Sequence, residues 1–263
     1  MFPIRKTLKA FLQAKQNIEL NRQLAQIKRQ DWGEVACVFQ PGKSGSTSAL
    51  DALLRSNYKY PVCHLHSFKD GVDTWNPTVK LEFLRRLRKG FGGRVKLIIP
   101  IREPISRNKS SFLQHVERHK RQPWDGIDFS VEEYWQMYLK SEKRFWLLNW
   151  FDNELKPHFG IDVYAQPFAG DHGVYTHKNV EALIYHHDIP DDKKSRLLCD
   201  FLKTSDITVS RSNVTASKKS SLPENLQLKP TREYIEEMLH SKYASHFFKE
   251  KIAEISNKYQ KNN

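Results

Sequence analysis

The stretch CVFQPGKSGSTSALDALL, residues 37–54, determines the fold that we expect. It begins as an apolar strand, passes through a turn of small and hydroxyl-bearing residues around one lysine, and continues as a helix. The backbone N–H groups of such a turn, with the start of the next helix, are oriented to bind a phosphate. The usual nucleotide-binding pattern requires a glycine five positions before its Gly–Lys pair, and Cys37 stands there. The sequence therefore predicts a phosphate-binding turn of a different kind.

Apolar β-rich runs alternate with helical runs from residue 34 onward. The run RVKLIIPI, residues 94–101, is apolar nearly throughout, as a parallel strand buried on both faces should be. This alternation predicts an α/β fold, a three-layer sandwich around a mostly parallel central sheet. We expect strands over residues 34–40, 61–66, 94–101, 161–168 and 182–188, and helices that end at Leu54 or cover residues 78–89, 104–119, 130–156, 190–203 and 231–258.

The first 30 residues are predicted to be separate from one domain over residues 31–263. Apolar residues recur in this segment at roughly helical spacing, and it holds seven basic residues and one acidic residue. Such a helix packs against its own domain or lies on an anionic membrane surface or a partner. The chain has no apolar stretch of about 20 residues and no apolar leader. We therefore expect a cytoplasmic protein that could touch the inner face of the membrane through residues 1–30.

The composition favours negatively charged partners. The 263 residues include 43 Lys and Arg against 30 Asp and Glu, a formal net charge of +13. Nucleotides, acidic glycans, nucleic acid and anionic membranes all suit this balance. Cys37, Cys63 and Cys199 include no C-x-x-C pair, which predicts reduced thiols rather than disulfides or zinc ligands. We expect no metal, because no other metal-ligand spacing is evident.

Ligands of parallel sheets bind beyond the carboxyl ends of the strands, and the first two predicted strands end in candidate residues. The first strand leads into the turn Gly42–Ser48, where Lys43 adds a full positive charge to the N–H groups. The second ends in CHLHSF, so that His64 and His66 share one face. Each histidine is either a hydrogen-bonded structural residue or a catalytic group, and His66 is the stronger candidate because it is nearer to the strand end.

The third predicted strand ends in IREPISRNKSSF, residues 101–112. Arg102 is the first charge after the apolar run, and Ser110 lies eight residues further on, inside the helix that Pro104 opens. Arg102, Arg107 and Ser110 could converge on a second phosphate near the start of that helix. Two anion sites at the ends of neighbouring strands form a stronger signal than either site alone.

These two stretches resemble the nucleotide motifs of sulfotransferases. PGKSGSTS, residues 41–48, resembles the P-K-S-G-T-T-W loop that binds the 5′-phosphosulfate of 3′-phosphoadenosine 5′-phosphosulfate (PAPS). REPISRNKSSF, residues 102–112, resembles the 3′-phosphate motif R-D-P-x-x-R-x-x-S-x-F, with the same arginine-to-serine spacing. The H-x-H pair is similar in position to the catalytic histidine of many sulfotransferases. FDNELKPHFGIDVY and NKY faintly resemble bacterial sulfotransferase-like proteins of capsular polysaccharide synthesis, and the likeness covers about residues 34–220.

The resemblance implies a P-loop-like sulfotransferase fold and a role for each motif residue. Lys43 would neutralise the charge on the bridging oxygen as the S–O bond breaks. His66, or else His64, would take the proton of the acceptor hydroxyl. Thr47 and Ser48 would hold the 5′-phosphate, and Arg102 with Ser110 the 3′-phosphate. The residues implied to bind the nucleotide are Lys43, Ser44, Gly45, Ser46, Thr47, Ser48, Arg102, Ser110 and Lys218.

Three positions depart from the family pattern. Ser48 replaces the tryptophan of the loop, so another residue must stack on the adenine, and Glu103 replaces the usual aspartate. The basic R-K-G loop that closes on the 3′-phosphate in cytosolic relatives is not clearly present. SNVTASKKSS, residues 212–221, is its candidate, with Lys218 and Lys219 as the expected anion ligands unless this is an ordinary solvated loop.

The resemblance favours a PAPS-dependent sulfotransferase that acts without metal on a hydroxyl of a saccharide or glycan and releases adenosine 3′,5′-diphosphate. A Mg²⁺-dependent phosphotransferase of P-loop type is one alternative, although Arg102 and Glu103 stand where it would need an aspartate. A basic protein that binds nucleic acid or an anionic membrane is another, and would use the net charge and residues 1–30. An inactive sulfotransferase fold kept as a scaffold is a third.

Two further features of the sequence have both a structural and a functional interpretation. The aromatic residues between 130 and 151 could form a wall that stacks on sugars, or belong to the core. The basic clusters RRLRK (85–89) and ERHKR (117–121) could guide an acidic acceptor, or be solvated helix faces.

Overall fold

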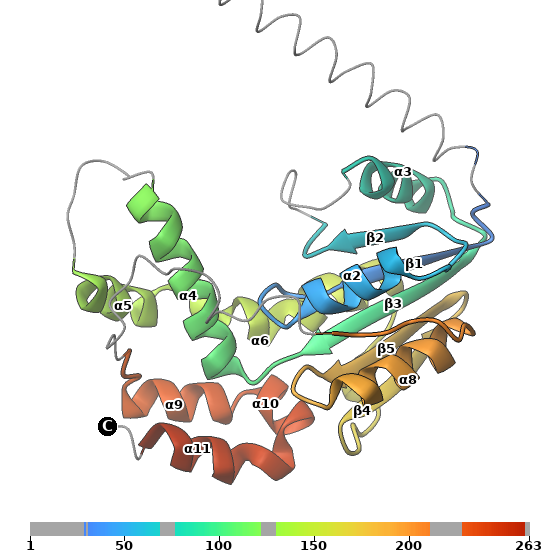
Figure 1. Ribbon diagram of the computed structural model, residues 1–263. Coiled ribbons are helices and arrows are strands. Elements are labelled where there is room, and N and C mark those ends of the chain that lie inside the picture. Colours follow the sequence, from blue (N-terminus) through green and yellow to red (C-terminus); the bar gives the residue numbers. More distant parts are fainter. Residues whose placement is uncertain (1–28, 30, 69–76, 122–129, 211–227, 261–263) are drawn as a thin grey trace, which may run out of the picture.

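Five strands form one central sheet in the computed structural model, which describes residues 29, 31–68, 77–121, 130–210 and 228–260 (Figure 1). The strands are β1 (Glu34–Phe39), β2 (Val62–Leu65), β3 (Arg94–Ile101), β4 (His172–His177) and β5 (Val180–His186). Their order is β2-β1-β3-β5-β4, in which β4 pairs antiparallel with β5 and the other pairs are parallel. The predicted α/β class and mostly parallel sheet are confirmed.

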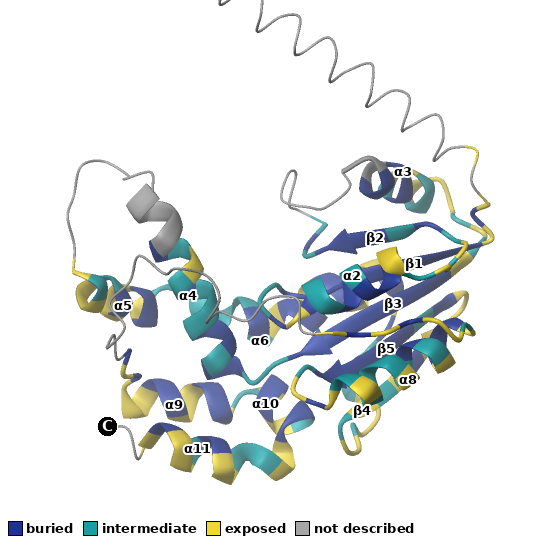
Figure 2. Cartoon of the chain, in the orientation of Figure 1, coloured by how far each residue is buried: buried dark blue, intermediate teal, exposed yellow. Residues whose placement is uncertain are grey.

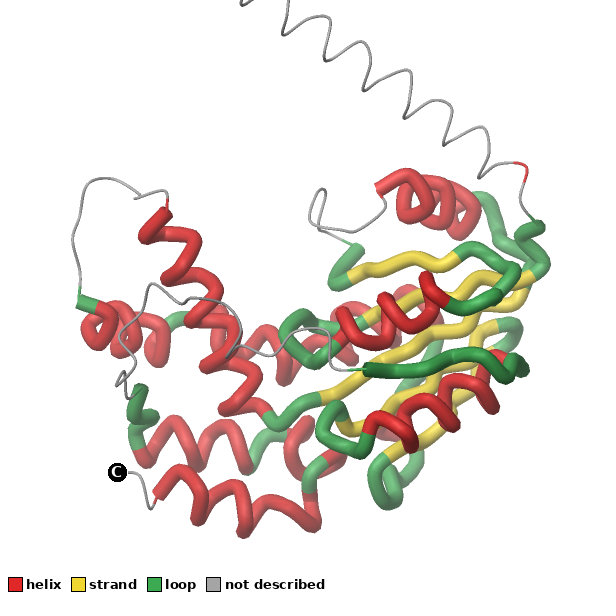
Figure 3. The backbone as a smooth tube through the Cα atoms, viewed as in Figure 1, coloured by secondary structure: helices red, strands yellow, loops and turns green. Residues whose placement is uncertain are grey.

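Helices connect the parallel strands, and further helices follow β5, the last of which lie side by side (Figure 3). The α-helices are α2 (Ser46–Arg55), α3 (Pro77–Arg88), α4 (Pro104–Arg121), α5 (Val131–Lys140), α6 (Trp146–Trp150), α7 (Lys156–Phe159), α8 (Asp191–Leu202), α9 (Arg232–Leu239), α10 (Lys242–Phe247) and α11 (Ile252–Gln260). The strand–helix alternation up to α8 places the turns after β1 and β3 at the same edge of the sheet, as parallel strands require.

Alternate residues of the strands enter two hydrophobic clusters, one on each face of the sheet. Val35 and Phe39 of β1 belong to the larger cluster, and Ala36 and Val38 to the smaller. Helices α2 and α8 contribute to the smaller cluster, whereas α3, α4, α5, α6 and the C-terminal helices contribute to the larger. Figure 2 shows the central strands buried along most of their length. Helices on both faces are consistent with the predicted three-layer sandwich.

One predicted strand is wrong and one observed strand was not predicted. Residues 161–168 form a 3₁₀ turn over Val163–Ala165, because the Asp162 carboxylate accepts the Tyr164 N–H at 3.1 Å and bends the chain. The antiparallel edge strand is β4 instead. Tyr175 is its one buried residue, so it lacks the apolar alternation by which strands are recognised.

The two long helices expected over residues 130–156 and 231–258 are each broken. Ser141 ends α5 with an extended backbone, and a π-helical turn over Phe151–Leu155 separates α6 from α7. Ser241 has an extended backbone and caps α10 with its hydroxyl. Such local serine contacts compete with continuation of the preceding helix, which the hydrophobic periodicity does not reveal. The aromatic residues Trp135 and Trp150 of the first segment are buried, and this places them in the core rather than on a sugar-binding wall.

Two predicted features lie outside the described residues. These are the N-terminal segment over residues 1–30, except for Arg29, and the basic loop with Lys218 and Lys219. Among the helices that the structure describes, none is long and apolar enough to cross a membrane.

The burial of the central strand predicts a clear difference between two leucine substitutions. Leu97 of β3 has no exposed surface, whereas Leu54 of α2 is 50% exposed. We expect Leu97→Ala to lower the free energy of unfolding by about 2–5 kcal/mol, because it leaves a cavity in the core. Leu54→Ala should change it by less than about 0.5 kcal/mol. Urea denaturation followed by circular dichroism measures both, and equal losses would contradict the placement of β3.

Candidate functional site

The turn that follows β1 has an unusual backbone. Gly42, Lys43 and Gly45 have φ angles of 81°, 63° and 84°, all in the left-handed region. Glycine adopts this region freely, but for lysine it costs of order 1–3 kcal/mol. Gly45 also approaches His187, because a Cβ built on it would lie 3.4 Å from the His187 Cβ. Strain of this kind is concentrated at sites that hold a ligand, so the turn is the first candidate for one.

Helix α2 starts at this turn with an uncapped amino end. Gly45 precedes it, no side chain of the described residues caps a first-turn N–H, and the first turn contains no acidic residue. These N–H groups lack partners within the helix and carry a partial positive charge. Beside them, the Ser44 Oγ is fully buried and has no hydrogen-bond partner in the described part of the chain. A buried hydroxyl without a partner is uncommon, and an anion on the turn would supply one.

The other predicted loop residues surround the same helix start. Ser46 is buried, whereas Thr47 and Ser48 are half-buried. The Ser48 hydroxyl donates to the Gly45 carbonyl at 3.0 Å, which closes the first turn of α2. Four hydroxyl groups are thereby gathered within about one helical turn of Lys43.

Arg102 lies directly after β3 and contacts the turn. Its Nη1 donates to the Lys43 carbonyl at 3.3 Å, and its Nε donates to the Ser106 Oγ at 2.8 Å. The contact follows from the sheet order, because β1 and β3 are neighbours. Ser110 is half-buried on α4, about one helical turn beyond Ser106. The structure therefore brings the two predicted anion-binding groups side by side.

The sequence suggested that Arg107 could converge with Arg102 on a second phosphate. In the structure the Arg107 side chain instead binds the backbone of the turn. It is buried and donates to the Pro41 carbonyl at 2.6 Å, to the Gly42 carbonyl at 3.0 Å and to the Asn108 side-chain oxygen at 3.1 Å. The Arg107 guanidinium thus forms hydrogen bonds with the backbone of the turn and stabilises the turn from the protein interior. The spacing of the motif could not distinguish a ligand-binding arginine from one that binds the loop.

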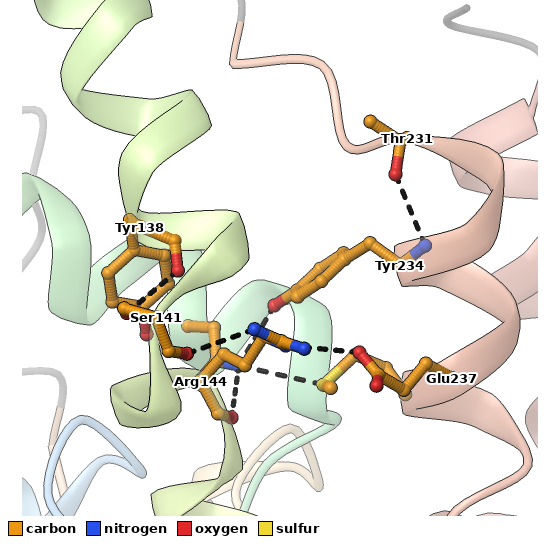
Figure 4. Close-up of polar contacts among 8 residues, drawn as sticks. Tyr138, Ser141, Arg144, Thr231, Tyr234 and Glu237 are labelled. Atoms are coloured by element: carbon orange, nitrogen blue, oxygen red, sulfur yellow. Dashed lines mark hydrogen bonds and ion pairs between the residues drawn. The ribbon is translucent and has the colours of Figure 1, made fainter.

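Asn108 connects this arginine to the helices beyond it. The Asn108 amide is fully buried and donates to the Tyr234 hydroxyl at 2.8 Å and to the Arg144 carbonyl at 2.9 Å. Figure 4 shows how these two partners are held: Arg144 donates to the Glu237 carboxylate at 3.1 Å, next to Tyr234 on α9. The position of the turn therefore depends on α9 and on the segment that follows α5, through Asn108 and Arg107.

The turn and the two arginines form a local excess of positive charge. Within the described residues, neither Arg102 nor Arg107 pairs with a carboxylate, and both bind carbonyl and hydroxyl or amide oxygens. The carboxylate next to Arg102 in the sequence, Glu103, accepts the Ile105 and Ser106 N–H groups at 2.8 and 2.9 Å and the Tyr259 hydroxyl. Burial lowers the pKa of both arginines, and an anion nearby would relieve this cost of desolvation.

His64 and His66 lie next to each other, with ring centroids 4.4 Å apart. Burial, with smaller effects of His66 and Lys80, lowers the pKa of His64 to about 3, so its ring is neutral at neutral pH. A group with that pKa is a weak general base near pH 7. The His66 ring is half-buried, and its Nδ1 lies 3.0 Å from the Gln40 carbonyl oxygen and 2.8 Å from the Gln40 Nε2. His66 is therefore the better candidate for proton transfer.

The end of β2 is fixed by Trp150, one of the aromatic residues noted between positions 130 and 151, and by Glu154, which the sequence analysis did not single out. The Trp150 indole donates to the His66 carbonyl at 2.7 Å. The buried Glu154 carboxylate accepts from the Ser67 hydroxyl at 2.8 Å and from the Phe68 N–H at 2.9 Å. Glu154 lies in the π-helical turn, a feature that is frequent at functional sites. The sequence feature that could have indicated this contact is the position of Glu154, a carboxylate shortly after the aromatic stretch that ends at Phe151.

His187 is a second residue that the sequence analysis missed. It follows β5, its N–H donates to the Ile101 carbonyl at 2.8 Å, and its side chain lies against Gly45. Burial and the charge of Arg102 lower its pKa to about 4, and its Nδ1 is buried with no hydrogen-bond partner in the described ranges. Since it stands at the carboxyl end of a predicted strand, the rule applied to the first three strands would have identified it.

The basic cluster over residues 85–89 lies away from this site. Arg85, Arg86 and Lys89 line an open hollow of about 410 Å³ together with Trp32 and the glycines before β3. These elements are at the amino edge of the sheet, whereas the Lys43 turn is at the carboxyl edge. Glu82, which is itself buried, forms ion pairs with both Arg85 and Arg86, so two of these positive charges are already paired within the protein.

The cysteines are free in the described structure. Cys37 and Cys63 are buried opposite each other on β1 and β2, and Cys199 is half-buried. Among residues 29, 31–68, 77–121, 130–210 and 228–260, no group of three His, Cys, Asp or Glu side chains is arranged to hold a metal ion.

Comparison with known proteins returns no match: no family model, no curated protein and no solved structure is similar to this chain. The function is therefore inferred from the residues and contacts described above.

The role of Arg107 predicts a loss of stability that an exposed arginine does not share. Arg107→Met removes the arginine donor from the Gly42 carbonyl and leaves the Pro41 carbonyl with the Trp146 indole N–H at 3.0 Å, and we expect the free energy of unfolding to fall by about 1–3 kcal/mol. Arg232, which is 79% exposed in its ion pair with Glu236, is the matched control, and Arg232→Met should cost less than about 0.5 kcal/mol. Urea denaturation compares them, and a stable Arg107→Met protein would show that the turn does not depend on this arginine.

The buried histidine predicts a loss of stability in acid. His64 has a folded-state pKa of about 3 against an ordinary value of 6.5, so the unfolded chain binds a proton between these pH values that the folded chain does not. Stability should therefore fall as the pH drops below about 6.5, by about 1.4 kcal/mol per pH unit for each such proton. His64→Gln should reduce the slope by about one proton between pH 6 and pH 4. Unfolding measured across this range tests it, and an unchanged slope would contradict the neutral state of His64.

Proposed function

We propose that the protein is a PAPS-dependent sulfotransferase with the P-loop-like fold of that family, acting on a hydroxyl of a saccharide or glycan. The observation that carries the proposal is the hydrogen bond between Arg102 and the Lys43 carbonyl. A nucleotide that bears phosphates at both its 5′ and 3′ positions requires two anion sites within its own length. The Arg102 guanidinium, bound to the backbone of the Lys43 turn, supports such a pair of neighbouring sites.

The chemistry of the turn supports an anion on it. The unpartnered Ser44 hydroxyl, the uncapped start of α2 and the absence of acidic residues from its first turn all suit a phosphate. Lys43, Ser44, Gly45, Ser46, Thr47 and Ser48 would hold the 5′ end of PAPS. Arg102 and Ser110 would hold the 3′-phosphate, and Lys218, which lies outside the described residues, would complete this second site.

PAPS supplies an activated sulfuryl group, whose transfer leaves adenosine 3′,5′-diphosphate. The Lys43 ammonium group would stabilise the negative charge that develops on the departing phosphate oxygen. As the acceptor oxygen forms its bond to sulfur and the bond from sulfur to that phosphate oxygen breaks, His66 would receive the proton of the acceptor hydroxyl. His66 suits this task better than His64, whose pKa of about 3 leaves it a weak base.

The class of acceptor follows from the likeness to proteins of capsular polysaccharide synthesis. The net charge of +13 also suits a glycan that already carries negative groups. The basic cluster over residues 85–89 is not part of this acceptor path in our proposal, because it lies at the other edge of the sheet.

Calorimetric titration with adenosine 3′,5′-diphosphate in the presence of EDTA tests the proposal. We expect the diphosphate to bind more tightly than AMP, and Lys43→Met and Arg102→Met each to weaken its binding by roughly 10- to 100-fold, the value of one charge-assisted contact. Arg102→Met should weaken the binding of AMP less than that of the diphosphate, since AMP lacks the 3′-phosphate. Lys89→Met, at the amino edge, is the control that should change neither. Equal affinity of the wild-type protein for AMP and the diphosphate would refute the proposal.

A further inference from the structure

Gln40 links the phosphate-binding turn to the candidate base. It follows β1 and is fully buried. Its side-chain oxygen Oε1 accepts the Gly42 N–H at 2.6 Å. Its side-chain nitrogen Nε2 lies 2.8 Å from the His66 Nδ1 and 3.5 Å from the His64 Nε2. One amide group therefore contacts the turn with one end and the histidine pair with the other.

The Gly42 contact fixes which way the amide faces. A backbone N–H can only donate, so the side-chain oxygen of Gln40 must be the atom that faces Gly42. The NH₂ group then faces His66, and it too can only donate. The His66 Nδ1 must accept this hydrogen bond with its lone pair, and the single proton of the neutral ring lies on Nε2.

The backbone carbonyl of Gln40 favours the opposite tautomer, with the proton on Nδ1. Its oxygen lies 3.0 Å from the His66 Nδ1, and a hydrogen bond between these two atoms needs a proton on Nδ1. The Nδ1 atom of a neutral ring cannot both accept a hydrogen bond from the amide and donate one to the carbonyl. While the Gln40 side-chain oxygen accepts the Gly42 N–H, we expect the shorter contact, with the amide at 2.8 Å, to be the hydrogen bond that forms. If the amide turned over, both oxygens of Gln40 would face Nδ1, and the ring proton would lie on that nitrogen.

We propose that Gln40 is a positioning residue that couples the Lys43 turn to the proton state of His66. With Gly42 on the Gln40 oxygen, the His66 Nε2 carries the proton and cannot take one from a hydroxyl. When an anion on the turn accepts the Gly42 N–H, the Gln40 amide is released to turn, the ring proton moves through solvent to Nδ1, and Nε2 gains a lone pair. The identity of that anion as a sulfuryl-donor nucleotide rests on the proposed function; the resting state of His66 does not.

The resting state is tested by ¹⁵N NMR of histidine-labelled protein without ligand, at a pH where His66 is neutral. His66→Gln identifies the His66 signals, and the unprotonated ring nitrogen resonates far downfield of the protonated one. We expect the wild-type ring to carry its proton on Nε2, and Gln40→Met, which loses the side-chain amide but keeps the backbone carbonyl beside Nδ1, to carry it on Nδ1. Gln40→Glu, which can only accept, should match Gln40→Met.

The same tautomer in the wild-type and Gln40→Met proteins would overturn the role of Gln40. If neither variant folds, the wild-type spectrum alone decides, because a proton on Nδ1 in the ligand-free protein contradicts the proposal. Thermal unfolding of each variant shows whether it is folded.

The coupling is tested by adding adenosine 3′,5′-diphosphate to the labelled wild-type protein, with saturation confirmed by calorimetry. We expect the ring proton to shift from Nε2 to Nδ1 in wild type and to stay on Nδ1 in Gln40→Met. A bound nucleotide without a shift in wild type overturns the coupling and leaves the proposed function standing. If the diphosphate does not bind at all, the proposed function and the coupling both fail, whereas the resting tautomer is still judged by the ligand-free spectra.

Discussion

The candidate site depends on the hydrogen bonds that two arginines donate to the backbone of one turn. Arg107 binds the carbonyls of Pro41 and Gly42, and Arg102 binds the carbonyl of Lys43. In a planar trans peptide the C=O and the following N–H point in opposite directions. Three successive N–H groups, those of residues 42–44, are thereby turned away from the arginines. The left-handed conformations of Gly42, Lys43 and Gly45 are the backbone that this arrangement requires.

The rest of the fold holds these arginines in place. Arg102 is aligned because β3 lies beside β1 in the sheet, and Arg107 because Asn108 is fixed by Tyr234 and by the Arg144 carbonyl. On the other side of the turn, Gln40 connects it to the histidines that end β2. The positive charges of the site come from Lys43, Arg102 and Arg107, whose positions are set by contacts within the fold. The net charge of +13 therefore indicates the kind of partner but does not locate its site.

The sequence predicted those parts of the structure that depend on local pattern. The apolar runs of β1 and β3, the turn between β1 and α2, and the helix opened by Pro104 are all found in the structure. The strand predicted over residues 161–168 is wrong, because the Asp162 carboxylate accepts a backbone N–H and turns this apolar run into a 3₁₀ turn. Strand β4 escaped notice because it buries a single side chain. Pattern shows where apolar residues recur, but not which of them a polar contact redirects.

The contacts that complete the site are long-range, and this is why sequence reasoning found only some of them. Arg107 reaches the turn from 65 and 66 positions away, and Glu154 reaches Phe68 from 86 positions away. Nothing in the spacing of a motif distinguishes an arginine that binds a phosphate from one that binds the loop around it. Gln40 and His187 acquire their meaning only from what faces them, namely His66 for the first and Gly45 for the second.

A crystal structure with adenosine 3′,5′-diphosphate, grown without divalent metal, tests the central claim most directly. The account predicts one nucleotide at the carboxyl edge of the sheet, with its 5′-phosphate on the N–H groups of the Lys43 turn and its 3′-phosphate on the Arg102 guanidinium. A nucleotide bound at another edge of the sheet, or with only one phosphate in contact with these two groups, would contradict it.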